Sequence, residues 1–229
     1  MCGRYTLTVD ASLLAELFEL EPPAGLAPRY NIAPTQIVPI VRHDADDARE
    51  WAEARWGLIP PWAKDITIGS RLINARAETA AEKPSFRVAF ASRRCLVPTD
   101  GFYEWVKTPG GKLPHHIRFA DRRPFAFAGL WETWNSPGGD TVESYTILTT
   151  TPNALVAPLH TRMPVILDPA RYDEWLQPAP LSPALADELL VPYPGDGLEA
   201  VPVSTAVNSV ANDDPRCIEP LGTQGTLGF

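Results

Sequence analysis

The chain carries a cysteine directly after the initiator methionine, in the opening Met1-Cys2-Gly3-Arg4. A small second residue generally permits removal of the initiator, so we predict a mature chain that begins at Cys2. Its first residue would then present an amine and a thiol on adjacent carbon atoms. An aldehyde condenses with such an amine to an imine, and the thiol then closes a five-membered thiazolidine. Ordinary pKa values of about 7.7 to 8.0 for the amine and about 8.5 for the thiol leave part of each group nucleophilic near neutral pH.

Two neighbouring residues bear on this chemistry. Gly3 permits a tight turn or a close approach to a ligand, and the planar guanidinium of Arg4 suits the binding of an anion. The alternative interpretation is that Cys2 belongs to a frayed terminus and has no function.

A carboxylate inside an aromatic strand is the second candidate for chemistry. Residues 95–98 predict a buried strand that leads into Asp-Gly-Phe-Tyr-Glu-Trp at 100–105. Alternation along a strand places Glu104 on the same face as Phe102 and Val106. Such surroundings raise a carboxyl pKa toward the value that a general acid or base needs near pH 7. A solvated or ion-paired Glu104 is the alternative.

His160 and Arg162 form a third candidate pair. His160 is one of only four histidines, and in an extended segment Arg162 points to the same side of the chain. Taken alone, His160 also fits a purely structural role.

Short strands and helices, separated by prolines, must position these residues. The 25 prolines favour an α+β domain with a strand-rich core over a parallel α/β fold. We predict a helix at 11–19 capped by Asp10, and a short helix capped by Thr151 or Asn153. The remaining predicted strands are 37–41 (with Pro39 at an edge or a bulge), 50–56, 115–119, 125–131, 144–150 and 198–203, and the remaining predicted helices are 78–81, 169–177 and 181–190.

Length and composition favour a single domain over residues 1–229. No linker interrupts the chain, and 45% hydrophobic residues with 7 tryptophans suffice for a sizeable core. No run is typical of a signal peptide or of a membrane span. The three cysteines are an odd number without the spacing of a metal site or a disulfide framework. We therefore expect a cytoplasmic protein that binds no metal.

The charge of the chain is unevenly distributed. The net charge is −8, but residues 55–123 hold 13 Lys and Arg against 6 Asp and Glu, while the remainder holds 7 against 22. The balances of +7 and −15 are compatible with one basic face on an otherwise acidic surface. A solvated run of charges is the alternative.

Seven motifs resemble, in order, those of the SRAP family, the SOS-response-associated peptidases or abasic-site-processing proteins. They are MCGRY at 1–5, YNIAPT at 30–35, WGLIPPW at 56–62, NARAET at 74–79, PTDGFYEW at 98–105, TTTPN at 149–153 and HTRMP at 160–164. The resemblance extends to Val207 and Asn208 and so covers nearly the whole chain. It implies a single domain with a β-barrel-like core and flanking short helices.

The resemblance also implies an activity. Proteins of this family bind single-stranded DNA and crosslink to abasic sites, whose opened sugar carries an aldehyde at C1′. Carried onto this sequence, the resemblance makes Cys2 the nucleophile and Asn74 the residue that orients the Cys2 amine or the sugar. Glu104 shuttles protons, and His160 acts as a second acid or base, or donates to the sugar and its 3′ phosphate. The family name further implies a peptidase that removes Met1, and strand cleavage by β-elimination is a competing, lyase-type reaction.

A set of DNA contacts follows from the same resemblance. Trp62 would stack on, or wedge beside, a base that flanks the lesion, and arginines would bind phosphates. The expected DNA-contacting residues are Arg4, Asn31, Trp62, Arg76, Thr149 and Arg162. We expect no cofactor and no membrane partner, and a monomer that associates with the nucleoid when it is on DNA.

Two other classes of protein remain open. The first is an N-terminal-nucleophile amidohydrolase or glutamine amidotransferase, in which the Cys2 thiol attacks an acyl carbon with the α-amine as base. Turnover of glutamine or a small amide would identify it. The second is a module that only coats single strands, which would bind DNA in a salt-dependent manner without forming an adduct.

Overall fold

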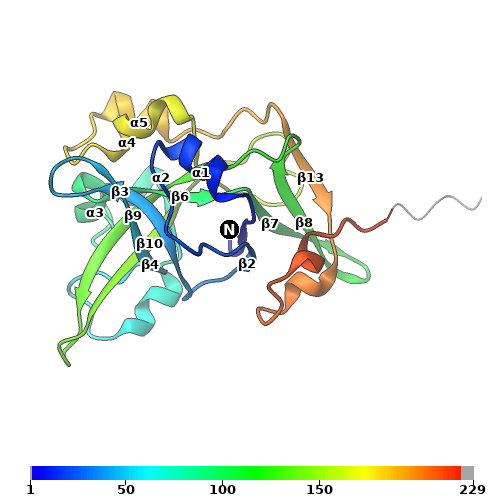
Figure 1. Cartoon of the computed structure of the whole chain (residues 1–229), viewed down its shortest axis with the longest axis horizontal. Coiled ribbons are helices and arrows are strands. Elements are labelled where there is room, and N and C mark those ends of the chain that lie inside the picture. The colour runs from blue at the N-terminus through cyan, green and yellow to red at the C-terminus, as the bar shows by residue number, and fades with distance from the viewer. Residues whose placement is uncertain (1, 223–229) are drawn as a thin grey trace, which may run out of the picture.

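The fold is built on a closed barrel of five strands, which lies to the left of the N-terminus in Figure 1. The computed structural model describes residues 2–222. Around the barrel the order is β10 (Thr141–Thr150), β4 (Arg49–Trp56), β3 (Ile37–His43), β6 (Arg94–Thr99) and β9 (Phe125–Asn135), and β9 closes the ring by pairing with β10. Every residue of β6 is buried, which explains its unbroken apolar run in the sequence. The predicted α+β class and strand-rich, barrel-like core are confirmed.

A second sheet holds the N-terminal strand. Its order is β13 (Leu198–Pro202), β8 (Gly111–Phe119), β7 (Gly101–Thr108), β1 (Tyr5–Leu7) and β2 (Arg29–Ile32). The strand β1 is short, but it pairs on both sides, with Tyr5 opposite Phe102 of β7 and Ile32 of β2. Because β6 continues into β7 through Asp100 alone, the two sheets are joined directly beneath β1.

Two further strands pair with the end of β10, and a third pairs with β9. The strand β5 (Asn74–Arg76) runs parallel to β10, with Asn74 opposite Ile147 and Arg76 opposite Thr149. The strand β11 (Met163–Pro164) is antiparallel to β10, and β12 (Ile166–Leu167) pairs with β9. The residues before β11 therefore lie at the same end of β10 as β5.

Short helices cover the sheets. The α-helices are α1 (Ala11–Phe18), α2 (Ala77–Ala80), α3 (Arg87–Ser92), α4 (Tyr172–Leu176) and α5 (Pro183–Leu189), and the 3₁₀ helices are η1 (Ile66–Arg71), η2 (Pro169–Arg171), η3 (Thr205–Asn208) and η4 (Pro215–Ile218). In Figure 1, the yellow α4 and α5 lie on one side of the barrel, and the orange-to-red C-terminal segment lies on the other, beside β8. Within the described residues, no helix is both long enough and apolar enough to cross a membrane.

Of three local predictions from the sequence, the structure confirms one, confirms another only in part and contradicts the third. Pro39 does lie at an edge, because β6 pairs with β3 only at Val41. Asp10 precedes α1 as predicted, but its side chain makes no capping hydrogen bond to any described residue. The helix predicted after Asn153 is wrong: the chain forms turns there, and the Asn153 side chain accepts from the Val156 amide at 2.9 Å. Pro158 lacks an amide hydrogen and prevents a continuing helix.

Candidate active site

Cys2 is packed into the protein rather than frayed. Its side chain is 0% exposed and belongs to the main hydrophobic core. Its carbonyl oxygen accepts a hydrogen bond of 2.8 Å from Asn74 Nδ2, and its thiol lies 3.7 Å from the Arg4 carbonyl oxygen. The interpretation of Cys2 as a frayed residue is therefore wrong. Met1, whose removal the sequence predicts, lies outside the described residues.

A buried carboxylate anchors the segment that leads from Cys2 through β1. Asp100 accepts from the Thr6 hydroxyl at 2.5 Å and from the Thr8 amide at 2.8 Å, and the Thr8 hydroxyl donates to it as well. The Tyr103 amide also donates to the Arg4 carbonyl at 3.0 Å. Sequence reasoning missed this role of Asp100. The signal was the pair of threonines at positions 6 and 8, which share one face of an extended strand.

Glu104 lies in the same buried region, on β7. Its side chain is only 3% exposed, and Phe102 lies two residues before it on the same strand. Burial raises the pKa of Glu104 to about 7. Burial also raises the pKa of the Cys2 thiol, and the negative charge of Glu104 raises it further. The thiol therefore stays protonated near neutral pH, while the carboxyl exists in both forms.

Asn74 contributes a second polar atom to the site. While Nδ2 binds the Cys2 carbonyl, the buried Oδ1 has no hydrogen-bond partner within residues 2–222. Buried polar atoms are rarely left unsatisfied, so this oxygen is an acceptor suited to an N–H or O–H group that arrives with a substrate.

His160 lies on the segment that precedes β11, at the end of β10. Its Nδ1 accepts from the Arg162 amide at 3.0 Å and also lies 3.3 Å from the Arg162 carbonyl oxygen. The shorter contact favours the neutral ring with its proton on Nε2. Burial lowers the pKa of His160, and this favours the neutral ring. The imidazole is therefore arranged to donate through Nε2.

Arg162 is held by a fork of hydrogen bonds. Its Nη1 and Nη2 donate to the two carboxylate oxygens of Glu78 at 2.7 and 2.8 Å, and Nη2 also donates to the Thr149 carbonyl at 2.5 Å. The side chain of Glu78 is more exposed than that of Arg162, so the carboxylate covers the guanidinium from the solvent side.

Two of the expected DNA contacts face inward. Asn31 is fully buried: its Oδ1 accepts from Arg4 at 3.0 Å, and its Nδ2 donates to the carbonyls of Val207, Ser209 and Asn212. The side chain of Thr149 is buried as well, and its hydroxyl donates to the Ala75 carbonyl at 3.3 Å.

Other expected contacts are accessible. Trp62 is 58% exposed and Arg76 is exposed. The loop that carries Trp62 is fixed by a close crossing of Gly57 and Gly69, where an added Cβ on either residue would lie within 2.5 Å of the other's carbonyl oxygen. The tryptophan is thus displayed on a fixed loop.

The described part of the chain contains no cluster of three or more histidine, cysteine, aspartate or glutamate side chains arranged to hold a metal ion. The site consists of a buried cysteine three residues before β1, an amide that holds its backbone, and a carboxyl whose pKa lies near 7.

Comparison with known proteins identifies the family. The chain belongs to the SOS response associated peptidase (SRAP) family, whose model matches residues 1–210. It is 46% identical over 223 residues to the abasic site processing protein YoqW of Bacillus subtilis, covering 96% of this chain and 99% of that one. It is 31% identical over 264 residues to the abasic site processing protein HMCES of Gallus gallus, covering 96% and 78%.

A solved structure shows the same fold. The crystal structure of a protein from Bacteroides thetaiotaomicron superposes with a TM-score of 0.84 at 28% sequence identity, covering 96% of this chain and all of that one. The fold of this chain is therefore one that a crystal structure also shows.

Proposed function

We propose that this protein processes abasic sites in single-stranded DNA by joining its N-terminal Cys2 to the sugar aldehyde as a thiazolidine. The observation that carries the proposal is the contact of Asn74 with the Cys2 backbone next to a Glu104 carboxyl whose pKa is about 7. The names of the relatives, which describe abasic site processing, support the same substrate.

The chemistry begins at the amine rather than at the thiol, because burial keeps the thiol protonated. The free Cys2 amine adds to the C1′ aldehyde to give a carbinolamine. Protonated Glu104 then donates a proton to the carbinolamine hydroxyl, which leaves as water, and an imine protonated on nitrogen remains. The thiol adds to the C=N carbon: sulfur bonds to C1′, the electron pair of the C=N bond passes to the nitrogen, and the thiol proton passes to the Glu104 carboxylate, which is thereby protonated again. The net change is the loss of one water molecule.

Asn74 and His160 assist from either side of the sugar. The Oδ1 atom of Asn74 accepts from the Cys2 amine or from a sugar hydroxyl, which satisfies its vacant acceptor. His160, neutral and protonated on Nε2, donates to the sugar or its 3′ phosphate. An imine that escapes capture by sulfur is open to β-elimination of that phosphate, which accounts for a competing lyase-type reaction.

The DNA strand is held by cations and by an exposed aromatic ring. Arg76 and Arg162 bind phosphates at the end of β10, and Trp62 stacks on a base beside the lesion. The buried residues act indirectly: Asn31 holds Arg4, and the Thr149 carbonyl holds Arg162. Because Cys2 is buried, only an unpaired and flexible nucleotide can bring its sugar to the amine. One Cys2 suffices for one lesion, so we propose a monomer.

Met1 must leave before this reaction, because its peptide bond occupies the Cys2 nitrogen. We propose that the peptidase activity recorded in the family name is this self-removal, and that it requires no metal.

Variants at two of the three cysteines test the proposal. Cys2→Ala should bind single-stranded DNA but form no adduct that survives without borohydride, and Cys2→Ser should give only an imine that borohydride must trap. Cys217→Ser is the matched control, since its thiol bonds to the Asn212 carbonyl away from the site, and it should crosslink normally. A stable adduct with Cys2→Ala would refute the proposal, and glutamine turnover by the parent protein would favour an amidotransferase.

A further inference from the structure

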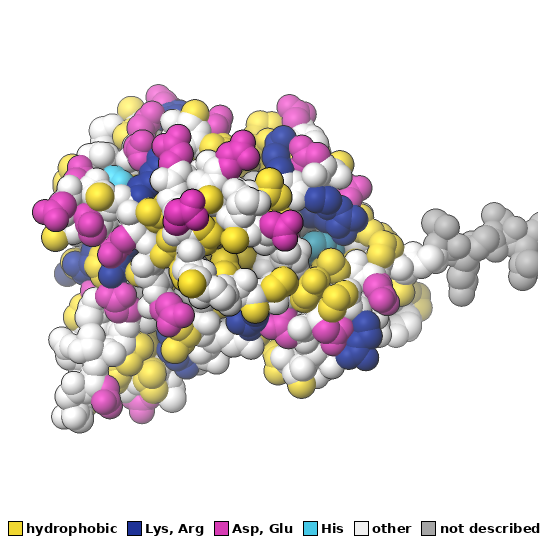
Figure 2. All heavy atoms as spheres, viewed as in Figure 1, with side chains coloured by type: hydrophobic (Ala, Val, Ile, Leu, Met, Phe, Trp, Pro, Cys, Tyr) yellow, Lys and Arg dark blue, Asp and Glu magenta, His cyan; other side chains and the backbone are white. Residues whose placement is uncertain are grey.

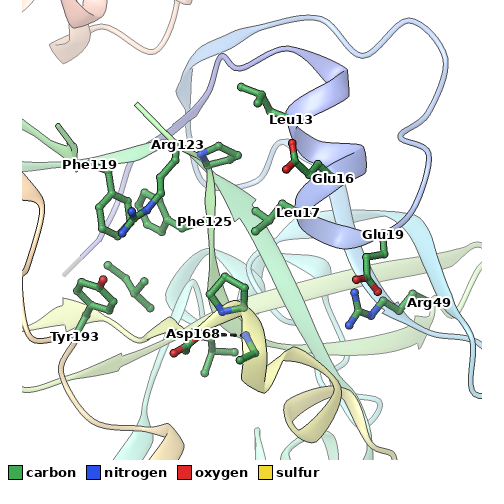
Figure 3. Close-up of a pocket in the computed structure, with 15 residues that line it drawn as sticks. Leu13, Glu16, Leu17, Glu19, Arg49, Phe119, Arg123, Phe125, Asp168 and Tyr193 are labelled. Carbon is green, nitrogen blue, oxygen red and sulfur yellow. Dashed lines mark hydrogen bonds between the residues drawn. The ribbon is translucent and has the colours of Figure 1, made fainter. Parts of the chain in front are cut away.

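A cavity lies beside α1, and its lining includes none of the residues proposed to handle DNA (Figure 3). Its volume is about 840 Å³, which is within the range of ligand-binding clefts. One wall is α1, and the other is formed by the start of η2 and by Tyr193. The described residues that line this cavity do not include Cys2, Asn74, Glu104 or His160.

The floor of this groove is apolar and rigid. Leu13 of α1 is 41% exposed and points into the groove together with Leu17. Phe119 packs edge-on against Phe125 and against Tyr193, with ring centroids 5.2 and 5.5 Å apart. Edge-to-face packing of this kind fixes the rings beneath the groove. Phe119 and Phe125 are themselves only 2% and 3% exposed, so the accessible apolar surface comes mainly from α1.

The rim of the groove carries unpaired negative charge. Glu16, Glu19 and Asp168 have no cationic partner within residues 2–222. The two arginines of the rim are already engaged. Arg49 pairs with Asp173 at 2.6 Å, and Arg123 pairs with Asp121 at 3.2 Å while its guanidinium lies 3.8 Å above the Phe119 ring.

The sequence segments around the groove also carry net negative charge. Residues 10–21 hold four acidic and no basic side chains, and residues 166–190 hold five acidic side chains and one arginine. Figure 2 shows acidic side chains in magenta spread around apolar ones over this part of the surface. Phosphates and anionic lipids are repelled by such a rim.

We propose that this groove docks a short segment of a partner protein in which an apolar or aromatic anchor is flanked by lysine or arginine. The anchor packs against Leu13 and Leu17 of α1, and the cations neutralise the acidic rim. The last seven residues of this chain, 223–229, contain no lysine or arginine and so do not match the rim. Docking here leaves the Cys2 site open, so a partner can hold the protein while it reacts with DNA.

A selection from random peptides tests this proposal. Displayed nine-residue peptides are selected on the full protein and counter-selected on the Leu13→Glu variant, whose exposed side chain permits folding. We expect the recovered peptides to share a central aromatic or aliphatic residue flanked by Lys or Arg. In fluorescence anisotropy, a recovered peptide should bind one to one and weaken as salt rises.

Charge reversal supplies the matched control. Glu16→Lys should weaken the peptide by about tenfold or more, while Glu53→Lys, an equal change at an exposed position of β4, should leave it unchanged. Both variants should still crosslink to abasic DNA, which separates this test from that of the proposed function. Recovery of acidic peptides, recovery of none, or equal binding to Glu16→Lys would overturn the proposal. So would sedimentation that shows a second copy of this chain occupying the groove.

Discussion

Replacing Glu104 with glutamine should stabilise the protein at high pH. The pKa of Glu104 lies about 2.5 above its ordinary value of 4.5, because the side chain is buried. At about 1.4 kcal/mol for each pH unit, an ionised Glu104 lowers the free energy of unfolding by about 3 kcal/mol. The folded protein holds the proton more tightly than the unfolded chain does. Stability is therefore lost as the pH rises from about 4.5 to about 7, and the full loss is present above that range.

Urea unfolding of Glu104→Gln and of the parent protein measures this effect. We expect equal free energies of unfolding at pH 4, and a variant that is more stable by about 3 kcal/mol at pH 9. Glu53→Gln, at an exposed position, should show no such dependence. A difference between Glu104→Gln and the parent that is the same at both pH values would show that the carboxyl titrates normally, and would refute the reasoning.

The same variant should lose activity, because an amide cannot transfer the protons of imine formation and ring closure. The adduct should form about 10² to 10⁴ times more slowly. In the parent protein the rate should rise as the Cys2 amine loses its proton and fall above about pH 7 as Glu104 loses its own. Glu104→Gln should lack the alkaline fall. A more stable but inactive variant would show that burial of this carboxyl serves chemistry rather than folding.

Three further substitutions test other parts of the account. Glu78→Gln should free the Arg162 fork and tighten binding of single-stranded DNA by about threefold to tenfold at low salt in an anisotropy titration, and weaker binding would contradict the phosphate role of this arginine. Asn31→Ala removes the donor of three backbone carbonyls and should lower the free energy of unfolding by about 2 to 3 kcal/mol, measured by urea; an unchanged value would mean that water replaces the amide. Gly57→Ala would place a methyl group 2.4 Å from the Gly69 carbonyl oxygen at a φ of +115°, and should cost about 2 to 4 kcal/mol in the same assay, whereas a fully stable variant would show that the loop crossing relaxes.

The strands and the Glu104 environment are predictable from sequence because they follow from local pattern. Alternation along 100–105 places Glu104 on the face of Phe102, and burial of that face raises its pKa. The edge position of Pro39 is predictable because proline has no backbone N–H to donate to a neighbouring strand. Each of these inferences needs only neighbours within a few residues.

The contacts that assemble the site depend on distant residues, and composition does not reveal them. Asn74 holds Cys2 across 72 positions, and Arg4 meets the Val207 carbonyl across 203. The motif resemblance singles out Asn31 as a DNA contact, but only the fold shows that its side chain faces inward. The groove beside α1 likewise forms where residues 13–19, 119–125 and 166–170 meet. These segments are far apart in the sequence, so no local sequence pattern predicts the groove.

Intact mass spectrometry tests the central claim most directly. The purified protein is mixed with a single-stranded oligonucleotide that bears one abasic site, and the adduct is weighed and mapped by peptide digestion. The account predicts a product equal to the protein without Met1, plus the oligonucleotide, minus one water, with the link at Cys2. A protein that keeps Met1 and stays unmodified, or an adduct that maps to another residue, would contradict it.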